Sequence, residues 1–280
     1  MKKIGFVDYY ISEWHANNYP AWIKQVSDKM GEDFEVKYAW AEKDVSPLDN
    51  KTTAEWCKEF GIQKCDTIEE LCEKSDYIVV LAPSDPDTHL RLAEQVLKYK
   101  KNTYIDKTFA PDVATAQKIF DIAKANGTKF FSSSALRFSK EMAEVTGRRG
   151  ETCVFGEGSN LDEYIIHIIE MTVAMQGVGA TAVRLNRSYS NYMIDIKYAD
   201  DRKATLIFAV GMPFRYVSFD GNSYKVADAG TDAFLGLMEA MLKFFNEGKV
   251  PFDTEQTMEV MRIRENIIKA KEREGEWLNI

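Results

Sequence analysis

The stretch Asp76-Tyr77-Ile78-Val79-Val80-Leu81-Ala82-Pro83 decides the fold of this chain. It is a continuous apolar run that ends in a turn signal, and such runs are typical of strands buried on both faces of a parallel sheet. Strand and helix patterns alternate on both sides of this run through the first half of the chain. The alternation predicts a doubly wound parallel sheet, the Rossmann-like fold.

The expected elements of this first half follow one another closely. We expect strands at 4–7, 34–41, 76–83, 102–105 and 129–132, and helices at 12–30, 53–60, 88–99 and 114–126. Gly61 and Gly127 stand where the left-handed residue that ends a helix is usual. Thr67 and Glu70 have the spacing of a capping box and predict one further helix start.

Past residue 135 the pattern changes. A helix expected at 161–176 is followed by runs with period-two alternation, which are linked by short polar segments. These runs cover 182–189, 192–198, 204–210, 216–219 and 223–226, and two helices are expected after them at 232–246 and 254–274. The pattern predicts an α+β domain with a mainly antiparallel sheet. We therefore expect a Rossmann-like domain over 1–135 and an α+β substrate or oligomerisation domain over 136–280.

Composition excludes several classes of protein. With 280 residues and 45% hydrophobic content, the chain can fill one large or two ordinary cores. A net charge of −8 without long single-sign runs argues against a nucleic-acid partner. No window has 18 consecutive apolar residues and no signal peptide is visible, so we expect a cytoplasmic protein that does not enter a membrane. The 4 cysteines lack a C-x-x-C pair and the 3 histidines are far apart, so neither disulfides nor a metal site is expected.

Lys107 is expected at the carboxyl end of the strand 102–105. Open α/β sheets hold their ligands at this edge. A lysine there can hold a substrate oxygen, or exchange a proton if partial desolvation lowers its pKa. The alternative is a solvated lysine that only flanks a strand.

Several short motifs occur in a characteristic order around this lysine. Ala82-Pro83 ends the apolar strand, Asp87-Thr88-His89 follows in the next helix, and Asp106-Lys107-Thr108 and Leu136-Arg137-Phe138 come after it. This order resembles the Gfo/Idh/MocA family of NAD(P)-dependent sugar dehydrogenases, which includes glucose-fructose oxidoreductase and inositol dehydrogenase. The resemblance implies a Rossmann domain followed by an antiparallel α/β domain. The family's E-K-P appears here as Asp106-Lys107-Thr108, which keeps the acid and the lysine.

The resemblance also implies a D-x-x-x-H motif on the first helix of the second domain. Glu163-Tyr164-Ile165-Ile166-His167 falls there, and a spacing of four puts Glu163 and His167 on one helical face. A carboxylate in that place can orient an imidazole and support its protonated form. The alternative is that Glu163, His167 and Glu170 form the solvated face of an amphipathic helix.

The first loop departs from the family pattern. In the family, the first strand runs into G-x-G-x-x-G, whose glycines let a diphosphate approach the backbone amides at a helix N-terminus. The three glycine positions fall on Asp8, Tyr10 and Glu13, which add two negative charges and one bulky ring. Trp14-His15-Ala16 still resembles the start of the family's first helix.

The resemblance implies hydride transfer between a sugar-like or cyclitol-like alcohol and the nicotinamide of NAD or NADP. Lys107 or His167 would take the hydroxyl proton while the other holds the oxyanion. Asp106 would position Lys107, Glu163 would orient His167, and Arg137 would contact substrate or backbone or form a surface ion pair.

The cofactor would contact the first loop, the strand ends and the following helix. The residues implied are Tyr9, Tyr10, Ile11, Glu42, Pro83, Ser84, His89 and Lys107. Glu42 stands where an acidic ribose anchor would favour NAD over NADP. His89 could equally be a capping or packing histidine.

Two other functions stay open on the sequence. Without the glycines, the chain could be a Rossmann-like protein that has lost dinucleotide binding and serves as a ligand-binding or partner subunit. It could also transfer protons on, or eliminate from, a sugar without an exchangeable cofactor. In each case we expect a small-molecule ligand and a homodimer or homotetramer formed through the C-terminal sheet.

Overall fold

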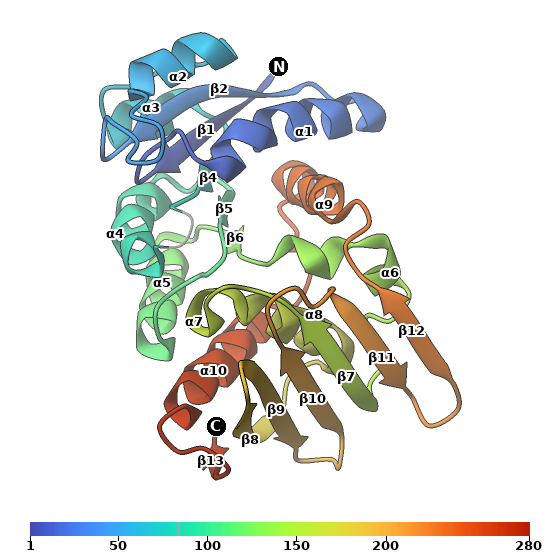
Figure 1. Ribbon diagram of the computed structural model, residues 1–280. Coiled ribbons are helices and arrows are strands. Elements are labelled where there is room, and N and C mark those ends of the chain that lie inside the picture. Colours follow the sequence, from blue (N-terminus) through green and yellow to red (C-terminus); the bar gives the residue numbers. More distant parts are fainter. Residues whose placement is uncertain (83–84) are drawn as a thin grey trace. The chain divides into compact units, whose positions relative to one another are not determined.

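The computed structural model describes residues 1–82 and 85–280, and the chain divides into two compact units. The first unit combines Met1–Ser133 with Leu237–Phe252, and the second combines Ser134–Gly236 with Asp253–Ile280. Most of helix α9 (Ala233–Glu247), drawn in orange in Figure 1, therefore belongs to the first unit although it comes late in the chain.

The first unit is built on a parallel sheet, in which the described residues form six strands in the order β3-β2-β1-β4-β5-β6. The strands are β1 (Lys2–Asp8), β2 (Phe34–Ala41), β3 (Gln63–Lys64), β4 (Tyr77–Val80), β5 (Thr103–Ile105) and β6 (Phe130–Phe131). The strand order changes direction between β1 and β4, and a doubly wound sheet opens its ligand crevice at such a switch point. The predicted Rossmann-like sheet is confirmed.

Helices connect these strands, and their ends follow the local sequence. They are α1 (Trp14–Met30), α2 (Thr53–Phe60), α3 (Ile68–Lys74), α4 (Pro86–Val96), the short 3-10 helix η1 (Leu97–Tyr99) and α5 (Val113–Asn126). Gly61 and Gly127 adopt the left-handed conformation after α2 and α5, as expected. Only half of the predicted capping box forms, because the Glu70 carboxylate accepts from the Asp66 amide at 2.9 Å while Thr67 accepts from the Glu70 amide.

Aromatic side chains attach the late segment to the first unit. The rings of Tyr77 and Phe245 stack with centroids 4.7 Å apart, and Phe131 meets Phe244 edge-on at 5.3 Å. Asn102 donates to the carbonyl oxygen of Phe245 at 3.2 Å. These contacts make α9 part of the core beneath the parallel sheet's strands β4 to β6.

The second unit is built on a mainly antiparallel sheet, also as predicted. Its described strands run in the order β12-β11-β7-β10-β9-β8-β13, and only β7 and β10 pair in parallel. The strands are β7 (Glu151–Gly156), β8 (Ala180–Ser188), β9 (Asn191–Tyr198), β10 (Lys203–Phe208), β11 (Arg215–Phe219), β12 (Tyr224–Asp228) and β13 (Trp277–Asn279). Along β9, Ile194 and Ile196 are buried whereas Met193 and Lys197 are exposed, which is the alternation expected of a one-sided sheet.

The helices of the second unit differ from expectation at one place. They are η2 (Ala135–Phe138), α6 (Lys140–Ala143), α7 (Leu161–Tyr164), α8 (Ile166–Gln176) and α10 (Glu255–Ala270). The single helix expected at 161–176 is divided at Ile165 into α7 and α8. Among the described residues of α8, His167 alone is not buried, so this helix has no solvated face.

Within the described parts of the chain, no helix is long and apolar enough to cross a membrane.

Gly5 tests the packing of β1 against α3. A Cβ at this position would clash with Ser75 Oγ and lie 2.6 Å from Leu71 Cδ2. We expect Gly5→Ala to lower the free energy of unfolding by about 1–3 kcal/mol through overpacking, as measured by urea denaturation.

Ser75→Ala provides the control. The hydroxyl of Ser75 makes no hydrogen bond to the described residues, so this change alone should be nearly neutral. Combined with Gly5→Ala it should recover part of the lost stability, and no recovery would contradict the predicted clash.

Candidate functional site

Lys107 lies just past β5, at the carboxyl edge of the parallel sheet, and is partly exposed. The amide of the preceding Asp106 donates to the carbonyl oxygen of Val80 at 2.9 Å, which continues the pairing of β4 with β5. The peptide bond between Lys107 and Thr108 is cis. The lysine thus stands at the strand end where the sequence predicts it.

The carboxylate of Asp106 is buried beside this lysine. Its Oδ1 accepts from the hydroxyl of Tyr104 at 3.0 Å, and its Oδ2 lies 3.7 Å from Nε2 of His15. The partners in the structure are therefore Tyr104 and His15, and the positioning of Lys107 by Asp106 stays a prediction.

Asp8 occupies the switch point of the sheet and is fully buried. Its Oδ1 accepts from the amides of Tyr9 at 2.7 Å and of Ala82 at 2.9 Å, so one carboxylate bridges the ends of β1 and β4. Its Oδ2 makes no hydrogen bond to the described residues. Burial, reinforced by the charge of Glu13, raises the pKa of Asp8 well above its ordinary value.

Glu13 caps helix α1 with its own carboxylate and is only 2% exposed. It accepts from the amide of His15 at 2.7 Å and from the amide of Ala16. The ring Nδ1 of His15 lies 3.1 Å from the same carboxylate, so the imidazole is held between Glu13 and Asp106. Burial acts to lower the pKa of His15, but the charges of Asp106 and Glu13 outweigh it and the pKa is raised.

These residues do not fit the diphosphate of a nicotinamide dinucleotide bound in the usual way at the start of α1. The amides of His15 and Ala16 already donate to a carboxylate of the same chain. Asp8 is buried at the switch point and bound to the amide of Ala82, and Tyr10 stands at the position of the second glycine. A diphosphate placed there would meet buried carboxylates instead of open amides.

The other residues of the first loop lie beside this cluster. Tyr9 and Tyr10 are partly exposed, with ring centroids 5.8 Å apart, whereas Ile11 is buried. Their contact with a cofactor stays a prediction.

The remaining predicted cofactor residues have partners within the first unit. Glu42 forms a bidentate pair with Arg91, with N–O distances of 2.9 and 3.0 Å. His89 is buried, with Nδ1 2.9 Å from the carbonyl oxygen of Thr108 and Nε2 against that of Leu81. Burial lowers the pKa of His89, which matches the packing role left open by the sequence. Pro83 and Ser84 lie outside the described residues.

His167 belongs to the second unit, whereas Lys107 belongs to the first. Its Nδ1 lies 2.7 Å from Oγ of Ser134, and the ring of Phe214 stands nearly perpendicular to the imidazole, with centroids 5.9 Å apart. The orienting role of Glu163 stays a prediction. Sequence reasoning missed Ser134, whose only signal was a run of three serines after the last strand of the parallel sheet.

Arg137 and Glu170 form a buried ion pair in the second unit. The Nε of Arg137 donates to Glu170 at 2.7 Å, and Nη1 donates to the side-chain oxygen of Gln256 at 2.7 Å. The alternative that Glu170 lies on a solvated face is therefore wrong, because Arg137 supplies the counter-charge that allows its burial. A substrate contact of Arg137 stays a prediction.

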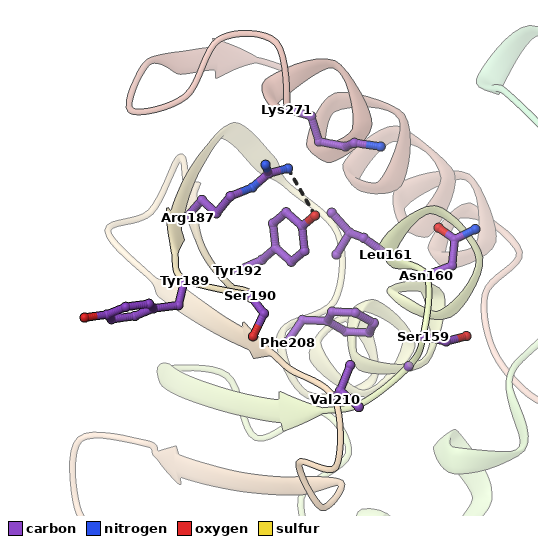
Figure 2. Close-up of a pocket in the computed structure, with 11 residues that line it drawn as sticks. Ser159, Asn160, Leu161, Arg187, Tyr189, Ser190, Tyr192, Phe208, Val210 and Lys271 are labelled. Atoms are coloured by element: carbon purple, nitrogen blue, oxygen red, sulfur yellow. Dashed lines mark hydrogen bonds between the residues drawn. The ribbon is translucent and has the colours of Figure 1, made fainter.

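A pocket of about 390 Å³ opens in the second unit beside the hairpin of β8 and β9. Figure 2 shows Arg187, Tyr192 and Lys271 around it, with the guanidinium of Arg187 donating to the hydroxyl of Tyr192 at 3.1 Å and Tyr189 projecting outward. The Lys271 ammonium is paired with Asp162 at 2.7 Å. None of the site residues predicted from the sequence lines this pocket.

Among the described residues, no group of three or more His, Cys, Asp and Glu side chains could hold a metal ion. Cys57, Cys65, Cys72 and Cys153 are free thiols.

Comparison with known proteins shows which family part of the chain resembles. Residues 43–134 match the model of a family described as an oxidoreductase family with an NAD-binding Rossmann fold, Gfo/Idh/MocA. This segment of the chain is therefore similar to Gfo/Idh/MocA-family oxidoreductases. The resemblance predicted from the sequence is confirmed, and the match begins after the loop in which the glycines are missing.

Solved structures share the fold at low sequence identity. A probable dehydrogenase from Thermotoga maritima superimposes with a TM-score of 0.81 at 14% identity, covering 99% of this chain and 98% of that one. A myo-inositol dehydrogenase from Corynebacterium glutamicum gives 0.79 at 11%, covering 100% and 98%. GenD2 from gentamicin A biosynthesis, in complex with NAD, gives 0.78 at 12%, covering 100% and 97%. No curated protein matches the sequence.

Asp8→Asn tests the charge balance at the switch point. The folded pKa of Asp8 is raised, so the native state binds this proton more tightly than the unfolded chain. The stability that Asp8 contributes is full below the unfolded value near 3.8 and is lost as the pH rises through the folded pKa. An asparagine keeps the Oδ1 acceptor and carries no charge, so we expect it to raise the free energy of unfolding at pH 7 by roughly 1 kcal/mol.

The measurement is urea denaturation of both proteins from pH 3 to pH 8. The advantage of Asp8→Asn should vanish near the low end of this range. An advantage that does not change with pH would contradict the raised pKa.

Proposed function

We propose that this protein interconverts an alcohol and a carbonyl group on a sugar-like or cyclitol-like compound, with a nicotinamide coenzyme as the redox partner. The family description and the place of Lys107 at the carboxyl edge of the Rossmann sheet support the proposal. The dehydrogenases among the similar structures agree with it but share only the fold. The first loop does not fit the coenzyme diphosphate, so the steps proposed for this chain are those of its own side chains.

Lys107 exchanges the proton of the reacting hydroxyl. A partly exposed ammonium can donate a hydrogen bond to the substrate oxygen, and its neutral form can accept the hydroxyl proton. In the reverse direction the ammonium returns this proton to the carbonyl oxygen. We assign to Asp106, next to it in sequence, the positioning of Lys107.

His167 is the second polar group that we assign to the reaction. It is the residue of α8 that is not buried among those described, and Ser134 fixes its ring at 2.7 Å. We assign to it a hydrogen bond to the substrate oxygen, with Glu163 supporting the imidazole. The choice of NAD over NADP through Glu42 stays a prediction.

The cap on α1 favours a second candidate function. A chain that holds its own carboxylate at the phosphate position could bind sugar-like ligands without any dinucleotide. This candidate predicts a thermal shift with sugars or polyols alone, and no turnover with any of them when NAD⁺ or NADP⁺ is supplied at millimolar concentration.

Assembly and location stay predictions. A homodimer or homotetramer through the second unit's sheet would cover the side chains of Met193, Tyr224 and Val226, which are 44%, 69% and 61% exposed. A cytoplasmic location is expected from the sequence.

Lys107→Ala tests the central residue. We expect kcat on the responsive substrate of a sugar and polyol panel to fall by about 10²–10⁴-fold, because the proton loses its carrier. The thermal midpoint should change little, since the side chain is partly exposed. Lys124→Ala removes an exposed lysine from α5 and is the matched control. Equal turnover of the two variants would contradict the assignment of proton exchange to Lys107.

A double-variant cycle tests whether Lys107 and His167 serve one step. If they do, Lys107→Ala combined with His167→Asn should be little slower than the slower single variant. If the losses of kcat/KM in the two single variants multiply in the double variant, the two residues act independently.

A further inference from the structure

We propose that the carboxylate of Glu13 takes the place of a coenzyme diphosphate at the start of α1. This chain then binds a nicotinamide dinucleotide weakly. The inference goes beyond the proposed function, because it concerns the affinity for the dinucleotide and not the reaction.

The first amide groups of helix α1 already have hydrogen-bond partners. A phosphate is held at a helix start by amide groups that have no partner inside the helix. In α1, the amides of His15 and Ala16 both donate to Glu13. A diphosphate would have to displace a carboxylate that is tethered to the same helix and 2% exposed.

Acidic side chains surround the first loop. Glu13, Asp8 and Asp106 bring three carboxyl groups to the carboxyl ends of β1 and β5, all nearly or fully buried. His15 lies between two of them, with its ring nitrogens 3.1 Å from Glu13 and 3.7 Å from Asp106. The imidazole is thus already engaged by carboxyl groups of the same chain and is not open to an incoming phosphate.

A side chain also stands against the backbone at the switch point, between β1 and β4. In a glycine-rich loop, the diphosphate approaches the chain because no side chain stands between them. Here the buried Asp8 side chain stands at the end of β1 and accepts from the amide of Ala82 at 2.9 Å, which ties β1 to the end of β4. The backbone of the first loop is therefore bridged by a side chain where a glycine-rich loop leaves it bare.

The acidic residue expected to hold the coenzyme ribose is also engaged. Glu42 makes two hydrogen bonds to Arg91, so a ribose would compete with a bidentate guanidinium. The part of the chain that matches the family begins directly after Glu42 and covers the strands that carry Lys107. The first loop, which would bind the adenosine diphosphate half of the coenzyme, lies outside the matched segment.

Direct binding tests the proposal without reference to turnover. ADP, followed by calorimetry, probes the diphosphate site alone, and NADH, followed by nicotinamide fluorescence, probes the whole coenzyme. For the unmodified protein we expect dissociation constants of about 1 mM or weaker. Glu13→Ala frees the amides of His15 and Ala16 and should tighten binding of both probes by at least about tenfold.

Asp112→Ala is the matched control. Asp112 caps α5 with the same backbone conformation as Glu13 (φ −146, ψ 171) and accepts from the amide of Thr115 at 2.6 Å. Its loss should lower stability as much as the loss of the α1 cap, by the usual cost of an N-cap, but leave the affinity for ADP unchanged. If Glu13→Ala does not fold, Glu13→Gln keeps an acceptor without the charge and should tighten ADP binding by at least about threefold.

Three results would overturn the proposal. The first is micromolar binding of ADP or NADH by the unmodified protein, and the second is no gain in affinity for either Glu13 variant. The third is an equal gain in Asp112→Ala, which would trace the effect to general loosening of the unit. Failure of the proposed function looks different: every sugar and polyol would remain unconverted at saturating coenzyme, whatever the binding data show.

Discussion

The carboxylate of Glu13 on the first amides of α1 is the interaction on which the ligand edge of the first unit depends. This carboxylate accepts hydrogen bonds from the amides of His15 and Ala16, which would otherwise be open to a phosphate. It also holds the ring of His15 near Asp106. A hydrogen bond to a charged group contributes about 1.5–3 kcal/mol. Two like charges 4 Å apart repel by about 4 kcal/mol at an effective dielectric constant near 20. A diphosphate therefore loses more by approaching Glu13 than it gains from any one amide beyond it.

This cap requires further adjustments around it. Glu13, Asp8 and Asp106 are buried near one another, and such a group is stable only if protons or cations offset part of its charge. Burial alone would lower the pKa of His15, but Asp106 and Glu13 raise it, and burial raises the pKa of Asp8, so each of the two groups holds a proton more readily than its exposed counterpart does. Oδ1 of Asp8 accepts from the amides of Tyr9 and Ala82, and Oδ1 of Asp106 accepts from the hydroxyl of Tyr104. The first loop thus replaces the conformational freedom of glycine with a network of side chains.

The sequence predicted the sheet of the first unit well, because the apolar run over β4 and the regular alternation around it depend on local periodicity. It failed where the answer depends on partners distant in sequence. The segment Leu237–Phe252 shows an apolar stripe, but nothing in the stripe says that Tyr77 and Phe131 will cover it. Strand β7 was not predicted from the sequence, and its parallel partner β10 lies about 50 residues later.

The candidate site divides in the same way. The place of Lys107 followed from the strand that precedes it. The side chains that surround the predicted residues did not, since sequence spacing does not tell whether Glu13 turns towards solvent or back onto α1. Glu170 shows the same limit: helical periodicity put it opposite an apolar stripe, yet Arg137, from a different element, made its burial possible. Periodicity describes one face of one element, whereas a site is made by several.

In the first unit, different segments carry the residue assigned to the chemistry and the residues at the coenzyme phosphate position, two functions that usually come together in a Rossmann unit. Lys107 follows β5, within the region that matches the family, and sets what chemistry is available at the sheet edge. Glu13 and Asp8 follow β1, outside that region, and set what can be anchored there. The first loop contacts the segments that follow β4 and β5 in two places, where His15 lies near Asp106 and where Asp8 accepts from the amide of Ala82. Because these contacts tie the replaced loop to the lysine strand, restoring glycines at Asp8 and Glu13 would free the phosphate site but also remove the partners that hold His15 beside Asp106.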